Sequence, residues 1–152
     1  MLKVGDPAPD FQLDSDTGDA IRLSGLRGKK VILYFYPKDD TPGCTTEACE
    51  FRDRVPDIQR VGAVVLGVSP DSVKSHQKFR SKYELPFVLL SDPDHTVADA
   101  YGAWGEKKMY GKTYEGVLRT TYVIDEGGIV EEIFGKVKPK GHGDAVLQVL
   151  GG

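Results

Sequence analysis

The chain contains two cysteines, and both lie in one short segment, at Cys44 and Cys49. They follow the apolar run Val31–Tyr36, and a helical pattern begins just beyond that run. A thiol at such a strand-to-helix turn meets the positive end of the helix dipole and unpaired backbone N–H groups, and both favour thiolate over thiol. The thiolate is the reactive form, so Cys44 is a candidate nucleophile.

The C-x4-C spacing limits what these cysteines can do. It is not the C-x2-C spacing of dithiol oxidoreductases, and a zinc site would need about four ligands. The three histidines lie far from the cysteines in sequence, so we expect no metal and no cofactor. In a helix, five residues place two Cα atoms roughly 8–9 Å apart, beyond the limit of about 7 Å for a disulfide. A bond between Cys44 and Cys49 would therefore require the first turns of the helix to unwind.

Several interpretations of the two cysteines are compatible with this spacing. In the first, Cys44 attacks an electrophile and becomes a sulfenic acid, and Cys49 then condenses with it to form a disulfide. Cys44 is the attacking residue because it lies nearer the start of the helix and gains more from the dipole. In the second, both are ordinary buried cysteines of an amphipathic helix. A thiol–disulfide oxidoreductase and a peroxide-sensing redox switch on the same fold are further alternatives.

Hydrophobic patterning predicts the elements that position the cysteines. Three unbroken apolar runs are typical of strands covered on both faces: Val31–Tyr36, Ala63–Val68 and Phe87–Leu90. A helical period runs from Cys44 to Ile58, and Pro56 inside it predicts a kink or an early end.

Turn and capping signals predict the remaining elements. These are an early hairpin around Asp14–Asp19, a second helix capped by Ser69–Ser72, a short helix over Thr96–Tyr101, a hairpin of Arg119–Asp125 with Ile129–Phe134, and a closing helix over Gly143–Leu150. Strands that alternate with helices indicate an α/β protein. We expect a thioredoxin-like fold over a single domain of residues 1–152, with a central mixed sheet flanked by helices and an N-terminal β-hairpin extension.

Composition excludes several classes of function. With 152 residues, of which 39% are apolar and 28% charged, the chain fits one ordinary globular domain. A net charge of −3 without a basic stripe argues against nucleic-acid binding. No stretch has the length and apolarity of a membrane span or a secretion signal. We therefore expect a cytoplasmic protein, where a disulfide is transient, and a monomer, since no long apolar helix is exposed.

The segment around the cysteines resembles a known active site. Its pattern Pro37-x-x-x-Thr41-x-x-Cys44 is similar to the signature of the peroxiredoxins, and the longer segment Tyr36–Phe51 resembles the subgroup called bacterioferritin comigratory protein or peroxiredoxin Q. The likeness spans nearly the whole chain. It implies a cysteine-dependent peroxidase that reduces hydrogen peroxide and organic hydroperoxides, with thioredoxin as the electron donor.

The resemblance also implies roles for individual residues. Thr41 would accept a hydrogen bond from the peroxide or donate one to the thiolate. The N–H groups of Gly43 and Cys44 would hold the peroxide oxygens. Arg119 would keep the thiolate charged and stabilise the negative charge that develops as the O–O bond breaks. Pro37 would shape the turn without offering a competing N–H group.

Other polar residues have simpler interpretations. Glu47 and Glu50 lie early in the helix, where carboxylates favour the dipole, and helix stability explains them adequately. A contact of Glu47 with the site is an alternative that we do not favour. His76 lies on the apolar side of its helix and is interpreted as a core histidine. His142 is expected to be an exposed loop residue.

Overall fold

The structure is a computed structural model that describes residues 2–151, except for the side chain of Met109. Its elements are β1 (Gln12–Ser15), β2 (Ala20–Arg22), the 3-10 helix η1 (Leu23–Leu26), β3 (Lys30–Phe35), α1 (Pro42–Arg60), β4 (Ala63–Ser69), α2 (Val73–Tyr83), β5 (Val88–Ser91), α3 (Thr96–Tyr101), β6 (Trp104–Met109), β7 (Lys112–Val117), β8 (Thr120–Ile124), β9 (Val130–Phe134) and α4 (His142–Val149).

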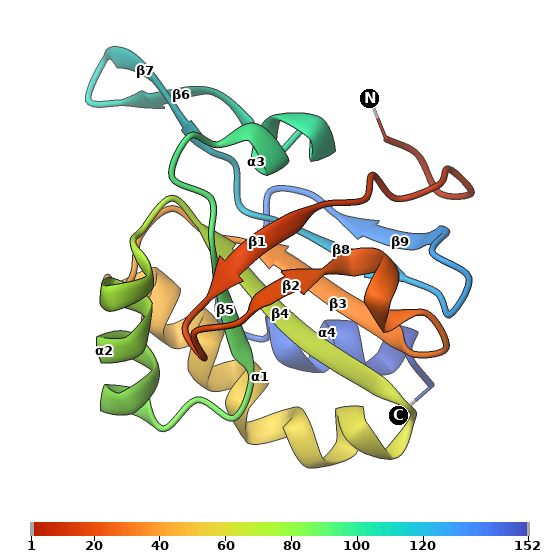
Figure 1. Cartoon of the computed structure of the whole chain (residues 1–152). Helices are drawn as coiled ribbons and strands as arrows, with labels where there is room; N and C mark the ends of the chain where they lie inside the picture. The colour runs from red at the N-terminus through yellow and green to blue at the C-terminus, as the bar shows by residue number, and fades with distance from the viewer. Residues whose placement is uncertain (1, 152) are drawn as a thin grey trace.

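Seven of the strands form one mixed sheet in the order β2-β1-β5-β4-β3-β8-β9 (Figure 1). β4 pairs in parallel with both β3 and β5, whereas β3 pairs antiparallel with β8. The β1–β2 hairpin extends the sheet because β1 pairs antiparallel with β5. The mixed sheet and its N-terminal hairpin agree with the sequence-based expectation.

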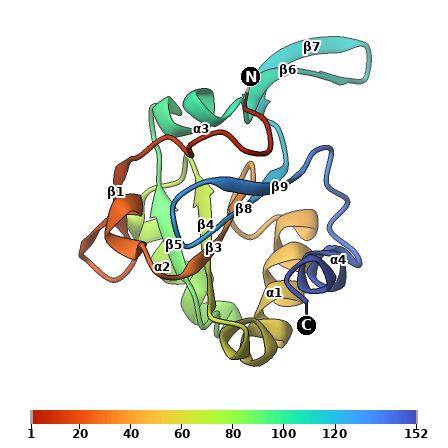
Figure 2. The ribbon, with the colours of Figure 1, turned by 90° about the vertical axis from the view of Figure 1, so that its right-hand side faces the viewer.

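Side chains of the central strand β3 alternate between two hydrophobic cores. Ile32 and Tyr34 pack in the core that includes residues of α1, α2 and α4, whereas Leu33 and Phe35 pack in the core that includes α3 and η1. Burial on both faces explains why this strand appears in the sequence as an unbroken apolar run. The sheet is thus a middle layer with helices on each side (Figures 1 and 2).

The separate β6–β7 hairpin was not expected from the sequence. It projects from the body of the molecule in both views (Figures 1 and 2). Its turn residues Tyr110 and Gly111 have φ of 52° and 75°, as a two-residue type I′ turn requires. Five of the twelve residues in its strands are charged and β7 is mostly exposed, so the strands lack the apolar alternation by which a strand is recognised.

The expected early end of the first long helix is wrong. Helix α1 continues through Pro56 to Arg60. Pro56 lies on the exposed side of the helix, so its ring faces solvent and the buried neighbours Val55 and Ile58 keep their packing in the core. Tertiary packing of this face outweighs the lost backbone hydrogen bond.

Candidate active site

The start of α1 places Cys44 directly after the central strand. β3 ends at Phe35, a short loop follows, and Pro42 opens the helix at its first position, where its missing N–H costs nothing. Thr45 N donates the first helical bond to the carbonyl of Thr41. The N–H groups of Gly43 and Cys44 therefore precede the helical ladder and point out of the helix start. The side chain of Cys44 is only 1% exposed.

Arg119, which immediately precedes β8, reaches Cys44 from the opposite side. Its Nη2 donates to Cys44 Sγ at 3.3 Å, and its Nη1 donates to Glu47 Oε1 at 2.7 Å. Burial alone would lower the pKa of Arg119, but the nearby Glu47 and Cys44 outweigh burial and raise it. The guanidinium thus bridges the sulfur and a buried carboxyl group. The structure thus brings together the cysteine and the arginine that the sequence analysis singled out.

Glu47 is a site residue, an alternative that the sequence analysis did not favour. Its side chain is fully buried, and burial raises its pKa to about 7 despite the attraction of Arg119. Among residues 2–151 no hydrogen-bond partner reaches its Oε2. The explanation by helix stability is therefore wrong, because the carboxylate faces Arg119 in the protein interior. The signal was its spacing: three residues after Cys44 in a helix, the two side chains share one face.

Thr41 and Pro37 lie on the loop that leads into α1. Thr41 occupies the N-cap position, but its side chain does not cap the helix. Instead, its Oγ1 donates to the carbonyl of Lys38 at 3.0 Å. The hydroxyl proton is thus committed to the loop, so of its two expected roles only acceptance of a hydrogen bond agrees with this geometry. Pro37 is half-buried directly after β3 and Tyr36.

Gly43 permits the close approach of Arg119 to the helix start. A Cβ atom at this position would lie 3.3 Å from Arg119 Nη2 and 3.5 Å from Pro139 Cγ. Most side chains at Gly43 would therefore push the guanidinium away from Cys44. This close approach gives a physical reason for glycine between Pro42 and the candidate nucleophile.

Comparisons with known proteins agree with this arrangement. Residues 4–133 match the family model described as the AhpC/TSA family. The chain is 54% identical over 150 residues to a putative peroxiredoxin bcp of Coxiella burnetii, covering 99% of this chain and 97% of that protein. It is 48% identical over 149 residues to peroxiredoxin Bcp of Bacillus subtilis, covering 98% and 95%. This chain belongs to the AhpC/TSA family of peroxiredoxins.

Solved structures confirm the thioredoxin-like peroxiredoxin fold. A Xanthomonas campestris peroxiredoxin Q superposes with a TM-score of 0.89 at 42% identity, covering 93% of this chain and 89% of that one. A mutant of a Xylella fastidiosa PrxQ gives a TM-score of 0.94 at 36% identity, covering 99% and 96%. The resemblance inferred from the Cys44 segment is therefore confirmed, and this peroxiredoxin is an enzyme of the Bcp or peroxiredoxin Q type.

Cys49 of this peroxiredoxin lies on the same unbroken helix as Cys44. Both thiols are free, with Cys44 buried and Cys49 partly exposed. The helical spacing of roughly 8–9 Å between their Cα atoms therefore applies, and α1 must unwind locally before the two sulfurs can bond.

His142 does not lie where the sequence analysis expected it. It is buried at the first turn of α4, where its Nε2 meets Thr121 Oγ1 at 2.8 Å and its ring packs edge-on against Phe51 and Phe134. Burial and the charge of Arg119 lower its pKa to about 4. The expectation of an exposed loop residue is wrong because α4 folds back onto α1 and buries this ring.

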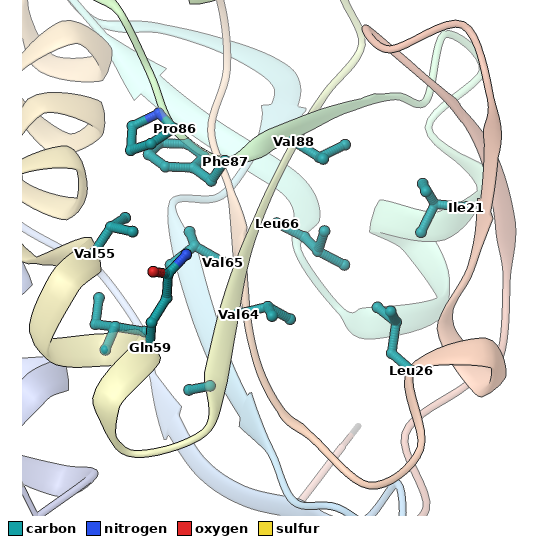
Figure 3. A pocket seen from close by; sticks show the side chains of 12 residues that line it. Ile21, Leu26, Val55, Gln59, Val64, Val65, Leu66, Pro86, Phe87 and Val88 are labelled. Carbon is teal, nitrogen blue, oxygen red and sulfur yellow. The ribbon is translucent and has the colours of Figure 1, made fainter.

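One apolar cavity lies away from the cysteines. It measures about 200 Å³ between the C-terminal half of α1 and the strands β4 and β5 (Figure 3). Val55 and Phe87 line it, together with Ile21 and Leu26 from the N-terminal segment, and no nucleophile or charged side chain does. A larger cavity of about 510 Å³ includes Arg119 in its wall. None of the helices in residues 2–151 is both long and apolar enough to cross a bilayer.

Proposed function

We propose that Cys44 is the nucleophile that attacks the peroxide. Its thiolate would attack one oxygen of a hydroperoxide and break the O–O bond, so that the sulfur becomes a sulfenic acid. The other oxygen would take up a proton and leave as water or an alcohol. The observation that carries this proposal is the 3.3 Å contact between Arg119 Nη2 and Cys44 Sγ at a helix start.

The neighbouring groups would stabilise the developing charge and bind the peroxide. Arg119 is placed to stabilise both the thiolate and the negative charge that develops on the leaving oxygen. The N–H groups of Gly43 and Cys44 would donate to the peroxide oxygens, and Thr41, whose own proton goes to Lys38, would accept a hydrogen bond from the peroxide. Pro37 would restrict the backbone conformation of the turn without adding a competing N–H donor.

Cys49 would complete the cycle as the resolving cysteine. Its thiol would attack the sulfenic acid of Cys44, release water and leave an intramolecular disulfide. Since both residues belong to α1, this step would require its first turns to unwind. A dithiol protein such as thioredoxin would then reduce the disulfide by two-electron exchange. We propose that the whole chain, residues 1–152, acts as a single cytoplasmic, monomeric domain without metal or cofactor.

Single-turnover reactions of cysteine variants test this proposal. With hydrogen peroxide, Cys49→Ser should give a sulfenic acid at Cys44, and excess peroxide should overoxidise it, as intact-protein mass spectrometry would detect. Cys44→Ser should lose peroxidase activity. Oxidised wild-type protein should contain one Cys44–Cys49 bond within a single chain. Full peroxidase activity in Cys44→Ser would overturn the assignment of the nucleophile, and an intermolecular disulfide would overturn the assignment of Cys49.

Turnover with a reductant separates the enzyme from a redox sensor. A peroxidase should consume peroxide repeatedly when reduced thioredoxin and its reductase are supplied. A sensor would oxidise rapidly in a stopped-flow experiment but turn over poorly. Rapid oxidation without turnover by thioredoxins, glutaredoxins or dithiothreitol would argue against the proposed cycle.

A further inference from the structure

The loop between β3 and α1 is held from outside by residues of α2. Asp39, in the middle of this loop, has a buried carboxylate that receives three hydrogen bonds. Tyr36 donates to its Oδ1 at 2.5 Å, and Ser75 Oγ and His76 Nδ1 lie 2.8 and 2.7 Å from its Oδ2. Two of these three partners belong to the first turn of α2. The loop that carries Thr41 is thereby tied to α2.

His76 is the most constrained of these partners. It is fully buried, as expected for a core histidine, and its Nε2 lies 2.9 Å from the carbonyl oxygen of Leu90. A carbonyl oxygen only accepts, so Nε2 carries a proton. Its Nδ1 faces the carboxylate of Asp39, which also accepts, so this nitrogen donates as well. The ring is thus fixed at both ends, and it holds Asp39 by a charge-assisted bond in the interior.

The backbone of Asp39 is fixed as firmly as its side chain. Its N–H donates to Asp71 Oδ2 at 2.8 Å, and the same oxygen accepts from Ser69 Oγ at 2.6 Å. The N–H of Asp39 and the carbonyl of Lys38 belong to one planar peptide, so they point in opposite directions. Fixing this N–H therefore fixes the direction of the Lys38 carbonyl. That carbonyl is the acceptor of the Thr41 hydroxyl.

The next residue adds a second tie to α2. Asp40 has a φ of 57°, a left-handed conformation that is unfavourable for most residues other than glycine. Its carboxylate accepts from Lys82 Nζ and Tyr83 OH, each at 2.8 Å, at the far end of α2. Strained backbone of this kind persists where its surroundings hold it.

Asp39, Asp71 and His76 also bring their polar atoms within 4.8 Å of one another. The oxygens that face this cluster already accept from Tyr36, Ser69 and Ser75. The cluster therefore has the pattern of a satisfied hydrogen-bond network.

We propose that His76 and Asp39 form a positioning pair for the peroxide reaction. His76 holds the side chain of Asp39, and this keeps peptide 38–39 where Asp71 binds its N–H and where its Lys38 carbonyl faces Thr41. The proton of Thr41 is thereby directed into the loop, and a lone pair of its hydroxyl is free to accept from the peroxide. This inference rests on the proposed function, because it assigns a purpose to Thr41 only if a peroxide binds beside Cys44.

Two substitutions of His76 separate positioning from general stability. His76→Asn retains an amide donor near the place of Nδ1, and so retains the bond to Asp39. His76→Gln places its amide nearer the Leu90 carbonyl and loses that bond. In single-turnover stopped flow, we expect His76→Gln to react with hydrogen peroxide about tenfold more slowly, as for one misplaced hydrogen-bond partner. His76→Asn should recover most of the rate.

A second reagent shows whether the thiol itself has changed. Alkylation of Cys44 by iodoacetamide needs the thiolate but no hydrogen bond to Thr41, so its rate should stay within about twofold in His76→Gln. Tyr101→Phe is the matched control, since it also removes a buried hydrogen bond, to the carbonyl of Pro9, within the opposite core. It should leave both rates unchanged. Parallel loss of both rates in His76→Gln would overturn the proposal.

A double-mutant cycle with Thr41→Val tests the route through the hydroxyl. Thr41→Val alone should slow the peroxide reaction, and adding His76→Gln should then have no further effect. Additive losses would show that His76 acts elsewhere and would overturn the inference. If Thr41→Val reacts with peroxide at the normal rate, the proposed role of Thr41 itself is overturned. If Thr41→Val reacts slowly but His76→Gln reacts at the normal rate, only the positioning pair is overturned. If His76→Gln fails to fold, Ser75→Ala replaces it in the test. This variant removes another donor to Asp39 and should also slow the peroxide reaction.

Discussion

Replacing Glu47 by glutamine should change how stability depends on pH. Burial raises the pKa of this carboxyl to about 7 in the folded protein, against a reference value of 4.5. Between these values the folded chain holds a proton that the unfolded chain has released, so stability falls as pH rises through this window. A pKa difference of roughly 2.5 corresponds to a loss of about 3 kcal/mol in the free energy of unfolding. Glutamine has a similar shape and does not titrate, so Glu47→Gln removes this loss.

Urea denaturation at several pH values measures the effect. The free energy of unfolding of reduced wild-type protein, minus that of Glu47→Gln, should fall by about 3 kcal/mol between pH 4.5 and pH 8. Glu115→Gln, at an exposed position of β7, controls for the loss of a formal charge. A difference that does not vary with pH would refute the reasoning. A difference that rises with pH would mean that the 2.7 Å ion pair with Arg119 outweighs burial.

Three further substitutions test the geometry of the site. Arg119→Lys keeps the charge but loses the two-pronged donation to Cys44 and Glu47, so stopped flow should show peroxide oxidation slowed by roughly 10²–10³. Gly43→Ala should slow the same reaction by about tenfold, since its Cβ would lie 3.3 Å from Arg119 Nη2; an unchanged rate would show that the guanidinium yields freely. For His142, whose pKa of about 4 lies below the reference value of 6.5, stability should be lost as pH falls between these values. His142→Asn should remove that loss in acid denaturation, and a wild-type protein equally stable across the window would contradict it.

The sequence predicted the parts of the fold that depend on local patterns. Strands β3 and β4 are covered on both faces, so their apolar runs were visible, and the hydroxyl of Ser72 caps α2 as its position indicated. Cys44 could be chosen from its place at a strand-to-helix turn. Arg119 could not, since it meets Cys44 from 75 residues away along the chain, and only the family resemblance identified it.

The missed features depend on tertiary contacts that no local pattern contains. Glu47 has the same sequence context as an ordinary carboxylate of an early helical turn, and only Arg119 makes it part of the site. His142 was mistaken for a loop residue because its burial depends on α4 packing against α1. Pro56 did not end its helix because the buried face beside it continues.

The proposed cycle needs the start of α1 to be ordered in one step and unwound in the next, and the hydrogen bonds of this helix differ between its two halves. In the proposed cycle, reaction with peroxide would need an ordered helix start, where Arg119 bonds to Cys44 and Glu47. Formation of the proposed disulfide would need that same start to unwind. The ties to α4 begin one residue after Cys49: Glu50 Oε1 accepts from Gly143 N at 3.2 Å, and Arg54 Nε donates to Asp144 at 2.7 Å.

These ties do not involve the turns before Cys49, so unwinding of residues 42–49 can leave them intact. The same turns are held from outside by Arg119, which donates to Cys44 Sγ and to Glu47 Oε1. In the proposed cycle, oxidation of Cys44 to a sulfenic acid would disturb the bond that Arg119 donates to its sulfur, and this would lower the cost of opening the first turns. The chemistry of the proposed first step would thereby favour the conformational change that the proposed second step requires, while the hydrogen bonds of Glu50 and Arg54 to α4 would still hold the remainder of α1.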